Sequence, residues 1–321
     1  MKSRHFVERA AAGCFLALAC CSVMLAQDAL TATRKGLELM GQARYGEAEE
    51  FLHRALEIAG PADSTAVYNL ANLYHRQGRF QEAERLHRLA LEQIERNHGP
   101  FDPEVAQSLN DLGALYRSVG RYSQAIEALE RAVLILERNP PQKFACTVFN
   151  NLGSAYIDIG QYAKAESMIR RALAVIEFGR YEDASDLGYT LSCLGRVHAL
   201  RKNYVEAEAA YSKALAIFGA TVGSRRPEYA LAQTNLALVY ERQQRSRESL
   251  PLFESAINIL EGSYGRESPV LTFVLYGYAK AMRHIGRKSE ARQIARRAKS
   301  MAGPRIGTGT VDVATLRHQR R

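Results

Sequence analysis

A repeat with a period of roughly 40 residues runs through this 321-residue chain. The stretch LNDLGALYRSVGRYSQAIEALERAV at 109–133 recurs as FNNLGSAYIDIGQYAKAESMIRRAL at 149–173, with the same spacing of small and aromatic residues. A fixed period of this length is typical of stacked supersecondary units and excludes one globular core. One small residue marks the register of each unit, at Ala48, Ala83, Ala125, Ala165, Ala207, Ser249 and Ala291. The steps between these positions are 35, 42, 40, 42, 42 and 42 residues.

Each unit has the pattern of two amphipathic helices. In the third unit, Leu109 and Tyr116 share one face at helical spacing, and a glycine then ends the run. Gly78, Gly120 and Gly160 occupy this position in successive units, where a helix C-terminus needs the left-handed conformation. Small residues recur where two helix axes must approach closely, at Ala71, Gly113, Gly153, Gly195 and Ala237. A hairpin this thin cannot bury both faces alone, so we expect neighbouring units to complete its core.

Three prolines mark the loops between units. Pro103, Pro227 and Pro269 lie at the same phase of the repeat. Asp102–Pro103 and Ser268–Pro269 fit a helix N-cap followed by proline at the first helical position. We therefore predict that a first helix begins at each of these two pairs.

The order of leucine, small residue, tyrosine, glycine, aromatic residue and two alanines resembles the tetratricopeptide (TPR) motif. The segment VYNLANLYHRQGRFQEAERLHRLALEQIE and the 42-residue step resemble the kinesin light chain type of TPR. The resemblance covers about 29–302 and implies an all-α fold, a right-handed α-solenoid of about seven TPR helix-turn-helix repeats. We expect the superhelix at 27–302, with repeats that start near 29, 64, 106, 146, 188, 230 and 272.

Residues 1–26 have the pattern of a secretory signal. Lys2, Arg4 and Arg9 precede an uncharged apolar run at 10–26, as in the charged and apolar regions of such leaders. Cleavage after Ala26 suits the polar start of the first helix. Cleavage after residue 19 would place Cys20 first, where the local sequence also resembles a weak bacterial lipobox. An uncleaved anchor formed by the apolar run alone would be slightly short for a bilayer. We predict an exported chain, periplasmic or secreted, with a lipidated Cys20 as the alternative.

Positive charge gathers at the C-terminal end. The formal net charge is +9, and residues 282–321 contain eleven Arg and Lys against Glu290 and Asp312 alone. We predict that residues 303–321 form a basic flexible tail after a solvated last helix. The alternative is a patch that contacts an anionic membrane surface or an acidic partner. Export argues against nucleic acid as a partner.

The chain has no sequence signature of catalysis or of a resident metal. It lacks HExxH, GxSxG, a P-loop and GxGxxG, and its histidines are scattered. The separation of Cys146 and Cys193 is not a metal-ligand spacing, so we expect small buried side chains. Acidic pairs such as Glu49–Glu50 are expected on a solvated face, and His87 in the core. We predict a protein that is not an enzyme and needs no cofactor.

The resemblance also implies a binding surface, because the first helices of TPR repeats line a concave groove. Kinesin light chain repeats use comparable asparagines to hold short peptides. Asparagine amides can hydrogen-bond both N–H and C=O of an extended peptide, and arginine adds forked donors for carboxylates. Asn69, Asn151 and Asn235 are excluded, because the motif favours Asn there for structural reasons. The predicted peptide-binding residues are Tyr68, Asn72, His75, Arg76, Asn110, Arg117, Asn150, Arg196, Arg242, Tyr276, Lys280 and Arg283.

These observations predict a non-enzymatic TPR scaffold that binds a partner protein or extended peptide in its concave groove, in an extracytoplasmic compartment. Two alternatives stay open at this point: a membrane-tethered lipoprotein that acts as an assembly factor, and a regulatory subunit of an enzyme or secretion complex. The sequence leaves the ligand, its orientation, the cleavage site and the oligomeric state open.

Overall fold

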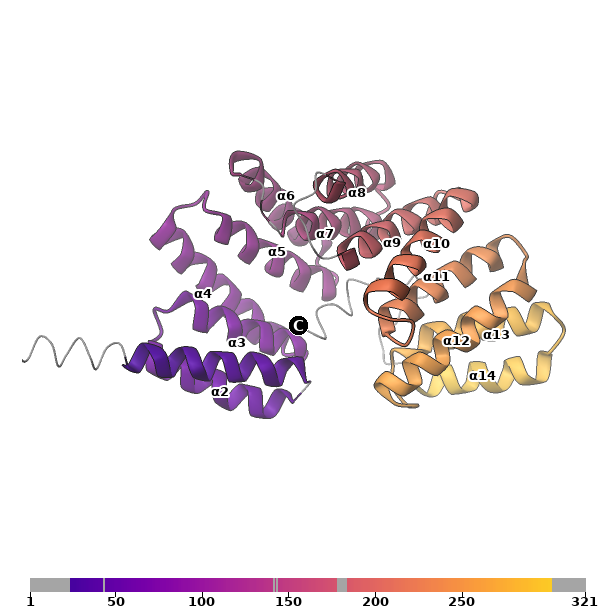
Figure 1. The fold of residues 1–321 in the computed structure, drawn as a ribbon, viewed down its shortest axis with the longest axis horizontal. Helices are drawn as coiled ribbons and strands as arrows, with labels where there is room; N and C mark the ends of the chain where they lie inside the picture. The colour runs from indigo at the N-terminus through magenta and orange to yellow at the C-terminus, as the bar shows by residue number, and fades with distance from the viewer. Residues whose placement is uncertain (1–23, 43, 141, 143, 178–183, 302–321) are drawn as a thin grey trace, which may run out of the picture. The chain divides into compact units, whose positions relative to one another are not determined.

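The computed structural model describes residues 24–42, 44–140, 142, 144–177 and 184–301 (Figure 1). Within these ranges the chain forms fourteen helices and no strand. They are a helix over residues 24–41 and then α2 (Tyr45–Ala59), α3 (Ser64–Arg76), α4 (Phe80–His98), α5 (Pro103–Ser118), α6 (Tyr122–Arg138), α7 (Ala145–Asp158), α8 (Tyr162–Glu177), α9 (Ala184–Leu200), α10 (Tyr204–Thr221), α11 (Pro227–Arg242), α12 (Ser246–Tyr264), α13 (Leu271–His284) and α14 (Lys288–Met301). The predicted all-α fold of seven successive helix pairs is confirmed.

The described residues divide into two compact units. The N-terminal unit ends at Arg121 and contains the helices up to α5, and the C-terminal unit begins at Tyr122 and contains α6 to α14. The boundary therefore falls between the two helices of the third repeat. Residues 1–23 and 302–321 lie outside the described ranges, so Cys20 and the predicted basic tail stay predictions. The last three residues of the predicted leader, 24–26, are described and are part of the first helix. Removal of the leader stays a prediction.

Within each unit, every helix pair packs against the next one. In the N-terminal unit α3 contacts α4 and also α5, the first helix of the following repeat. In the C-terminal unit the first helices α7, α9, α11 and α13 contact one another in order, and each second helix contacts the first helix that follows it (Figure 1). Side chains on neighbouring first helices can therefore form contacts about one repeat apart in sequence.

The small residues act at close helix contacts, as predicted. A Cβ atom on Gly153 would lie 2.9 Å from a side-chain carbon of Ile169, and one on Gly195 would lie 3.0 Å from the ring of Tyr211. Both partners are fully buried, so neither can move aside cheaply. The marker residues Ala48, Ala83, Ala125, Ala165, Ala207 and Ser249 are likewise completely inaccessible to solvent.

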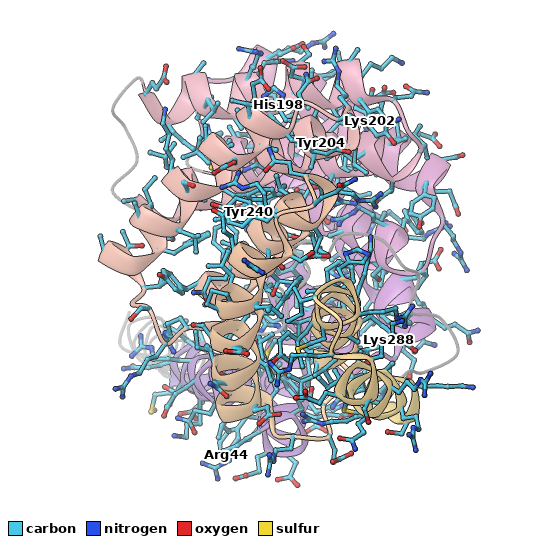
Figure 2. The ribbon with its side chains drawn as sticks, turned by 90° about the vertical axis from the view of Figure 1, so that its right-hand side faces the viewer. Arg44, His198, Lys202, Tyr204, Tyr240 and Lys288 are labelled. Carbon is cyan, nitrogen blue, oxygen red and sulfur yellow. The ribbon has the colours of Figure 1, made fainter. Side chains whose placement is uncertain are left out.

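The turns inside the hairpins use the left-handed conformation. Gly78, Gly120 and Gly160 have φ angles of 76°, 78° and 76°, which confirms their predicted role. In repeats five and six the same conformation is adopted by Lys202 (φ 65°) and Gln244 (φ 62°) (Lys202 is labelled in Figure 2). These two residues adopt a backbone conformation that glycine adopts at a lower cost in free energy.

One of the two predicted helix starts is confirmed and one is wrong. Asp102 caps α5, its carboxylate accepting from the Glu104 amide at 2.8 Å, and proline follows at the first position. At the other pair, α13 begins only at Leu271. Residues 269 and 270 form a turn before this helix.

A tyrosine–glutamate contact recurs between successive repeats. A glutamate directly after the marker alanine of one repeat faces a tyrosine late in the next first helix, and an arginine in the following turn binds the same glutamate. The three sets are Tyr74, Glu49 and Arg79; Tyr116, Glu84 and Arg121; and Tyr240, Glu208 and Arg245. Glu50 is exposed, as expected, whereas Glu49 is half-buried and its carboxylate accepts from Arg79 at 2.7 Å.

Two interfaces lack a glutamate directly after the marker and use a substitute. Ile126 and Leu250 occupy that position in repeats three and six. There Tyr156 donates to Glu130, and Tyr278 donates to Glu254 at 2.7 Å, one helical turn further along the second helix. The contact is thus kept although its acceptor has moved by one turn.

Among the described residues, no helix is both long and apolar enough to cross a bilayer. The last helix, α14, buries Ala291, Ala298 and Met301 and exposes Arg292 and Arg296, whereas Arg297 is half-buried and binds Glu261 at 2.7 Å.

Candidate partner-binding surface

All twelve predicted binding residues lie on first helices, but they differ in what they contact. Those of the N-terminal unit are on α3 and α5, and those of the C-terminal unit are on α7, α9, α11 and α13. Some are buried and bonded inside the stack, while others are exposed. The structure therefore separates a supporting set from a set that a partner can reach.

A buried carboxylate organises the predicted residues of the N-terminal unit. The Tyr68 hydroxyl donates to Asp111, and the Asn110 amide nitrogen donates to the same carboxylate at 3.1 Å. The Asn72 amide lies close enough to both groups to favour their ionised forms. Burial raises the pKa of Asp111, and burial together with the nearby carboxylate raises the pKa of Tyr68. These side chains form one network between α3 and α5.

Asp111 was missed by sequence reasoning, although its register was a usable signal. It occupies the position that Asn69, Asn151 and Asn235 occupy in other repeats, and those asparagines are buried. An aspartate in place of a structural asparagine indicates that a hydrogen-bond donor lies nearby. That partner is Tyr68, about one repeat earlier on the neighbouring first helix.

The remaining predicted residues of this unit are partly buried. The His75 ring lies edge-on to Phe80, with centroids 6.0 Å apart, and its Nε2 lies 3.4 Å from the Ser118 hydroxyl. Burial, with the charge of Arg76 beside it, lowers the pKa of His75 to about 4, so the ring is neutral at pH 7. Arg76 and Arg117 are half-buried on the same helices.

The predicted asparagines are enclosed rather than offered to solvent, which corrects the expected exposure. Asn110 is 5% exposed and Asn150 is 7% exposed. The Asn150 amide nitrogen donates to the Thr190 hydroxyl at 2.8 Å, which links α7 to α9. Little amide surface is left for a partner, so we place both residues in the supporting set.

Arg196 also belongs to the supporting set. Its guanidinium binds Asp158 at 2.7 Å, and both side chains are largely buried. The pair joins α9 to the end of α7 in the C-terminal unit. Removing one partner would leave a poorly solvated charge, so the pair has a structural role. The sequence had instead predicted that Arg196 binds a peptide.

Four predicted residues remain exposed, all in the C-terminal unit. Arg242 ends α11, and Tyr276, Lys280 and Arg283 follow one face of α13. Tyr276 is 42% exposed, which is high for a ring on a packed helix. Within the described residues, Arg242, Lys280 and Arg283 form neither an ion pair nor a side-chain hydrogen bond. This set offers three cations and one aromatic ring to a partner.

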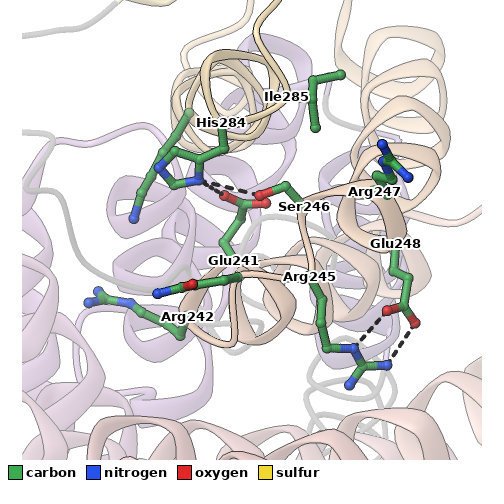
Figure 3. Close-up of a pocket in the computed structure, with 10 residues that line it drawn as sticks. Glu241, Arg242, Arg245, Ser246, Arg247, Glu248, His284 and Ile285 are labelled. Carbon is green, nitrogen blue, oxygen red and sulfur yellow. Dashed lines mark hydrogen bonds and ion pairs between the residues drawn. The ribbon is translucent and has the colours of Figure 1, made fainter.

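Two of these cations line an open pocket of about 1110 Å³ (Figure 3). The pocket is formed by the end of α11, the start of α12 and the end of α13. Its walls are Glu241, Arg242, Gln244, Arg245, Ser246, Arg247, Glu248, Lys280, His284 and Ile285.

Both acidic groups of this pocket already have partners, and its four Arg and Lys residues outnumber them. Glu241 is buried, accepts from the Ser249 hydroxyl at 2.6 Å and faces the His284 Nδ1 atom at 2.9 Å. Glu248 binds Arg245 at 2.7 Å (Figure 3). Arg242, Arg247 and Lys280 are left as exposed cations without an ion pair among the described residues. The pocket is thus complementary to an anionic group.

Serine, histidine and glutamate meet here, but not in the arrangement of a nucleophilic triad. Both the Ser246 hydroxyl, at 3.3 Å, and the Glu241 carboxylate approach the same ring atom, Nδ1 of His284. A triad requires the serine and the acid on opposite nitrogens, so that the ring can take the serine proton. This cluster therefore holds the helices together.

One further cluster was not indicated by sequence spacing. His98, Asp102 and Glu104 bring three ligand-type atoms within 4.8 Å of one another in the N-terminal unit. One Asp102 oxygen already caps α5, and the His98 and Glu104 side chains are exposed. Because exposed groups of this kind occur commonly without an ion, we assign no metal to them.

Comparison with known proteins identifies the repeat. Models described as tetratricopeptide repeat match residues 63–138, 146–177, 186–262 and 228–302, which is more than half of the chain. This chain belongs to the tetratricopeptide repeat family. The matches begin with the second helix pair, α3 and α4.

Curated relatives are similar to the chain over part of their length. "Protein KINESIN LIGHT CHAIN-RELATED 3" of Arabidopsis thaliana is 24% identical over 249 residues, which are 77% of this chain and 32% of that protein. "Protein KINESIN LIGHT CHAIN-RELATED 1" of the same plant is 28% identical over 114 residues, 33% of this chain and 19% of that protein. The chain thus spans a third or less of these relatives.

Solved structures share the fold. A putative kinesin light chain of Podosopora anserina with nearly identical TPR-like repeats has a TM-score of 0.52, at 23% identity, over 63% of this chain and 97% of that one. The apo form of RapI has a TM-score of 0.65, at 16% identity, over 85% of this chain and 97% of that one. At these identities the likeness shows the fold alone.

Proposed function

We propose that this TPR protein is a non-enzymatic scaffold that binds a segment of a partner protein along the exposed first-helix face of its C-terminal unit. The observation that carries this proposal is the set of Arg242, Tyr276, Lys280 and Arg283, which is exposed while the other predicted residues are buried or half-buried. Three cations without an ion pair to any residue that the structure describes, together with one accessible ring, suit an extended segment with acidic and apolar side chains.

The stacked helices favour binding at low ordering cost. Glu241, Ser249 and His284 tie α11, α12 and α13 together beneath the exposed residues. A preformed surface loses little conformational entropy when a partner binds, so modest contacts can give an affinity near 1 μM, about −8 kcal/mol. The same fold occurs in complexes, such as a Rap protein with Competence and Sporulation Factor.

Site-specific photo-crosslinking in cells that naturally produce the chain tests this proposal. A benzophenone amino acid in place of Tyr276 is expected to capture a discrete partner. The same group in place of Val205, which is 74% exposed on the second helix α10, provides the control. Adducts of equal yield and identity at both positions would contradict a first-helix binding surface.

We also propose that the scaffold works after export. The support is the order of charged and apolar residues at 1–26, and the alternative is tethering through a lipidated Cys20. Tethering would make the chain a membrane-bound assembly factor with the same binding surface. Regulation of an enzyme or a secretion complex would correspond to one particular partner of that surface.

A further inference from the structure

A small slot in the N-terminal unit is separate from the proposed binding surface. It has a volume of about 170 Å³ and lies between the first turn of α3, the end of α4 and the first turn of α5. This is well below the volume of pockets that hold drug-sized molecules, so the slot has room for one amino-acid side chain. Its lining residues are Ser64, Thr65, Tyr68, Ile94, Glu104 and Gln107.

The floor and one wall of the slot are held rigidly. Ile94 is only 6% exposed. The Tyr68 ring is fixed by its hydroxyl bond to Asp111 and by edge-on packing against His87, with centroids 6.0 Å apart. An aliphatic stem could therefore pack between a fixed aliphatic side chain and a fixed aromatic ring without reordering either one.

The electrostatics of the slot are negative. Glu104 is its one charged lining residue, is exposed, and forms no ion pair with any described residue. The N-termini of α3 and α5 oppose this with about half a positive charge each. Asp63 and Asp102, which cap these helices, and Glu104 together supply three carboxylates. The carboxylates outweigh the two helix ends, so a cationic group is favoured.

We propose that this slot binds one lysine or arginine side chain of a partner protein. The aliphatic stem would lie on Ile94, and the charged end would lie near the Tyr68 ring and the Glu104 carboxylate. A cation beside an aromatic face gains electrostatic attraction, and an exposed carboxylate adds a screened ion pair. The scaffold would then read a basic residue in the N-terminal unit and acidic groups in the C-terminal unit.

Methyl NMR of the full chain with labelled isoleucine δ1 groups tests this inference. N-acetyl-arginine amide is titrated against N-acetyl-citrulline amide, which has nearly the same shape without the charge. The Ile94 methyl signal should shift, while Ile169, buried in the C-terminal unit, should not. We expect the arginine probe to bind about fivefold more tightly than the citrulline probe.

Two substitutions make the test specific. Glu104→Gln should weaken the preference for arginine over citrulline, while Glu50→Gln, at an exposed carboxylate elsewhere in the same unit, should keep it. Equal affinity for both probes, or equal effects of the two substitutions, would overturn the inference. The C-terminal set of Arg242, Lys280 and Arg283 takes no part in this experiment. A negative result here would therefore not contradict the proposed function. A negative result for the proposed function would likewise not contradict binding in the slot.

Discussion

The guanidinium carbon of Arg245 lies 4.1 Å from the centre of the Tyr240 ring. The same guanidinium binds Glu208 of the preceding repeat at 2.7 Å, and Glu208 also accepts from the Tyr240 hydroxyl at 3.1 Å. Arg79 repeats this geometry over Tyr74, at 3.8 Å, in the N-terminal unit. A stacked cation and a shared carboxylate thus connect successive repeats in both units.

Replacing Arg245 should loosen one of these connections. We expect Arg245→Met to lower the Tm by about 2–4 °C, because the stacked cation and its contacts with Glu208 and Glu248 are lost together. Arg247→Met, at an exposed arginine with no ion pair among the described residues, should leave the Tm unchanged within about 1 °C. Thermal unfolding followed by circular dichroism measures both. An Arg245→Met variant as stable as Arg247→Met would show that these contacts together contribute nothing to stability.

High pH should destabilise the C-terminal unit through two tyrosines. Burial and the adjacent Glu130 raise the pKa of Tyr156 to about 12, and burial and Glu254 raise the pKa of Tyr278 to about 12. In the unfolded chain both ionise near pH 10. Their contribution is complete below pH 10 and is lost as the pH rises from about 10 to 12, because only the unfolded state releases these protons there. Tm measured from pH 9 to 12 should fall less steeply in Tyr156→Phe/Tyr278→Phe, and an unchanged slope would contradict this assignment.

Gln244→Gly should stabilise the chain. Gln244 adopts φ 62°, where a side chain costs about 1–2 kcal/mol that glycine avoids, although glycine also adds entropy to the unfolded state. We expect a net gain of about 0.5 kcal/mol from these opposing effects. The neighbouring Gln243→Gly, at φ −89°, should destabilise instead. Urea unfolding compares the two, and a loss of stability in both variants would rule out relief of strain.

Gly195→Ala should disrupt packing between α9 and α10. The new methyl group would lie 3.0 Å from the ring of Tyr211, which has no exposed surface. Overpacking of this kind typically costs about 1–3 kcal/mol. Gly262→Ala, in α12 with no atom within 4 Å of the added methyl group, should be neutral or stabilising by up to about 1 kcal/mol. A Gly195→Ala variant as stable as Gly262→Ala would contradict the close contact.

Much of the fold could be predicted from sequence, because local signals repeat. The marker alanines gave the number of helix pairs, and Gly78, Gly120 and Gly160 gave the ends of first helices. The helix start predicted at Ser268–Pro269 was wrong, because a turn and a helix N-terminus favour the same residue types. The helix after this pair begins only at Leu271.

The candidate site was predictable only in part, because contacts between repeats decide which of its residues are exposed. Positions on the first helix identified Asn150 and Arg242 equally well as groove residues. Only the structure shows that Asn150 meets Thr190 while Arg242 meets no partner in the described chain. Such a difference depends on a residue one repeat away, and no pattern within a single repeat contains it.

Export is tested at the mature N-terminus. We expect intact-mass and terminal-peptide analysis of the native protein to show removal of residues 1–26, with Gln27 as the new first residue. A diacylated Cys20 would instead establish tethering. An intact Met1 with its leader on a cytoplasmic protein would contradict both forms of the proposal.

The central claim is that a partner segment binds the exposed cations of the C-terminal unit without support from the buried network. Its most direct measurement is the Kd of the segment captured at Tyr276, made as a synthetic peptide and titrated by calorimetry. We predict that Arg242→Ser/Lys280→Ser/Arg283→Ser raises the Kd at least about tenfold, with the Tm unchanged within about 2 °C. The matched triple variant Lys288→Ser/Arg292→Ser/Arg296→Ser, which removes three exposed cations from α14, should change the Kd by less than about twofold. Equal losses in the two triple variants, or no loss in the first, would contradict the account.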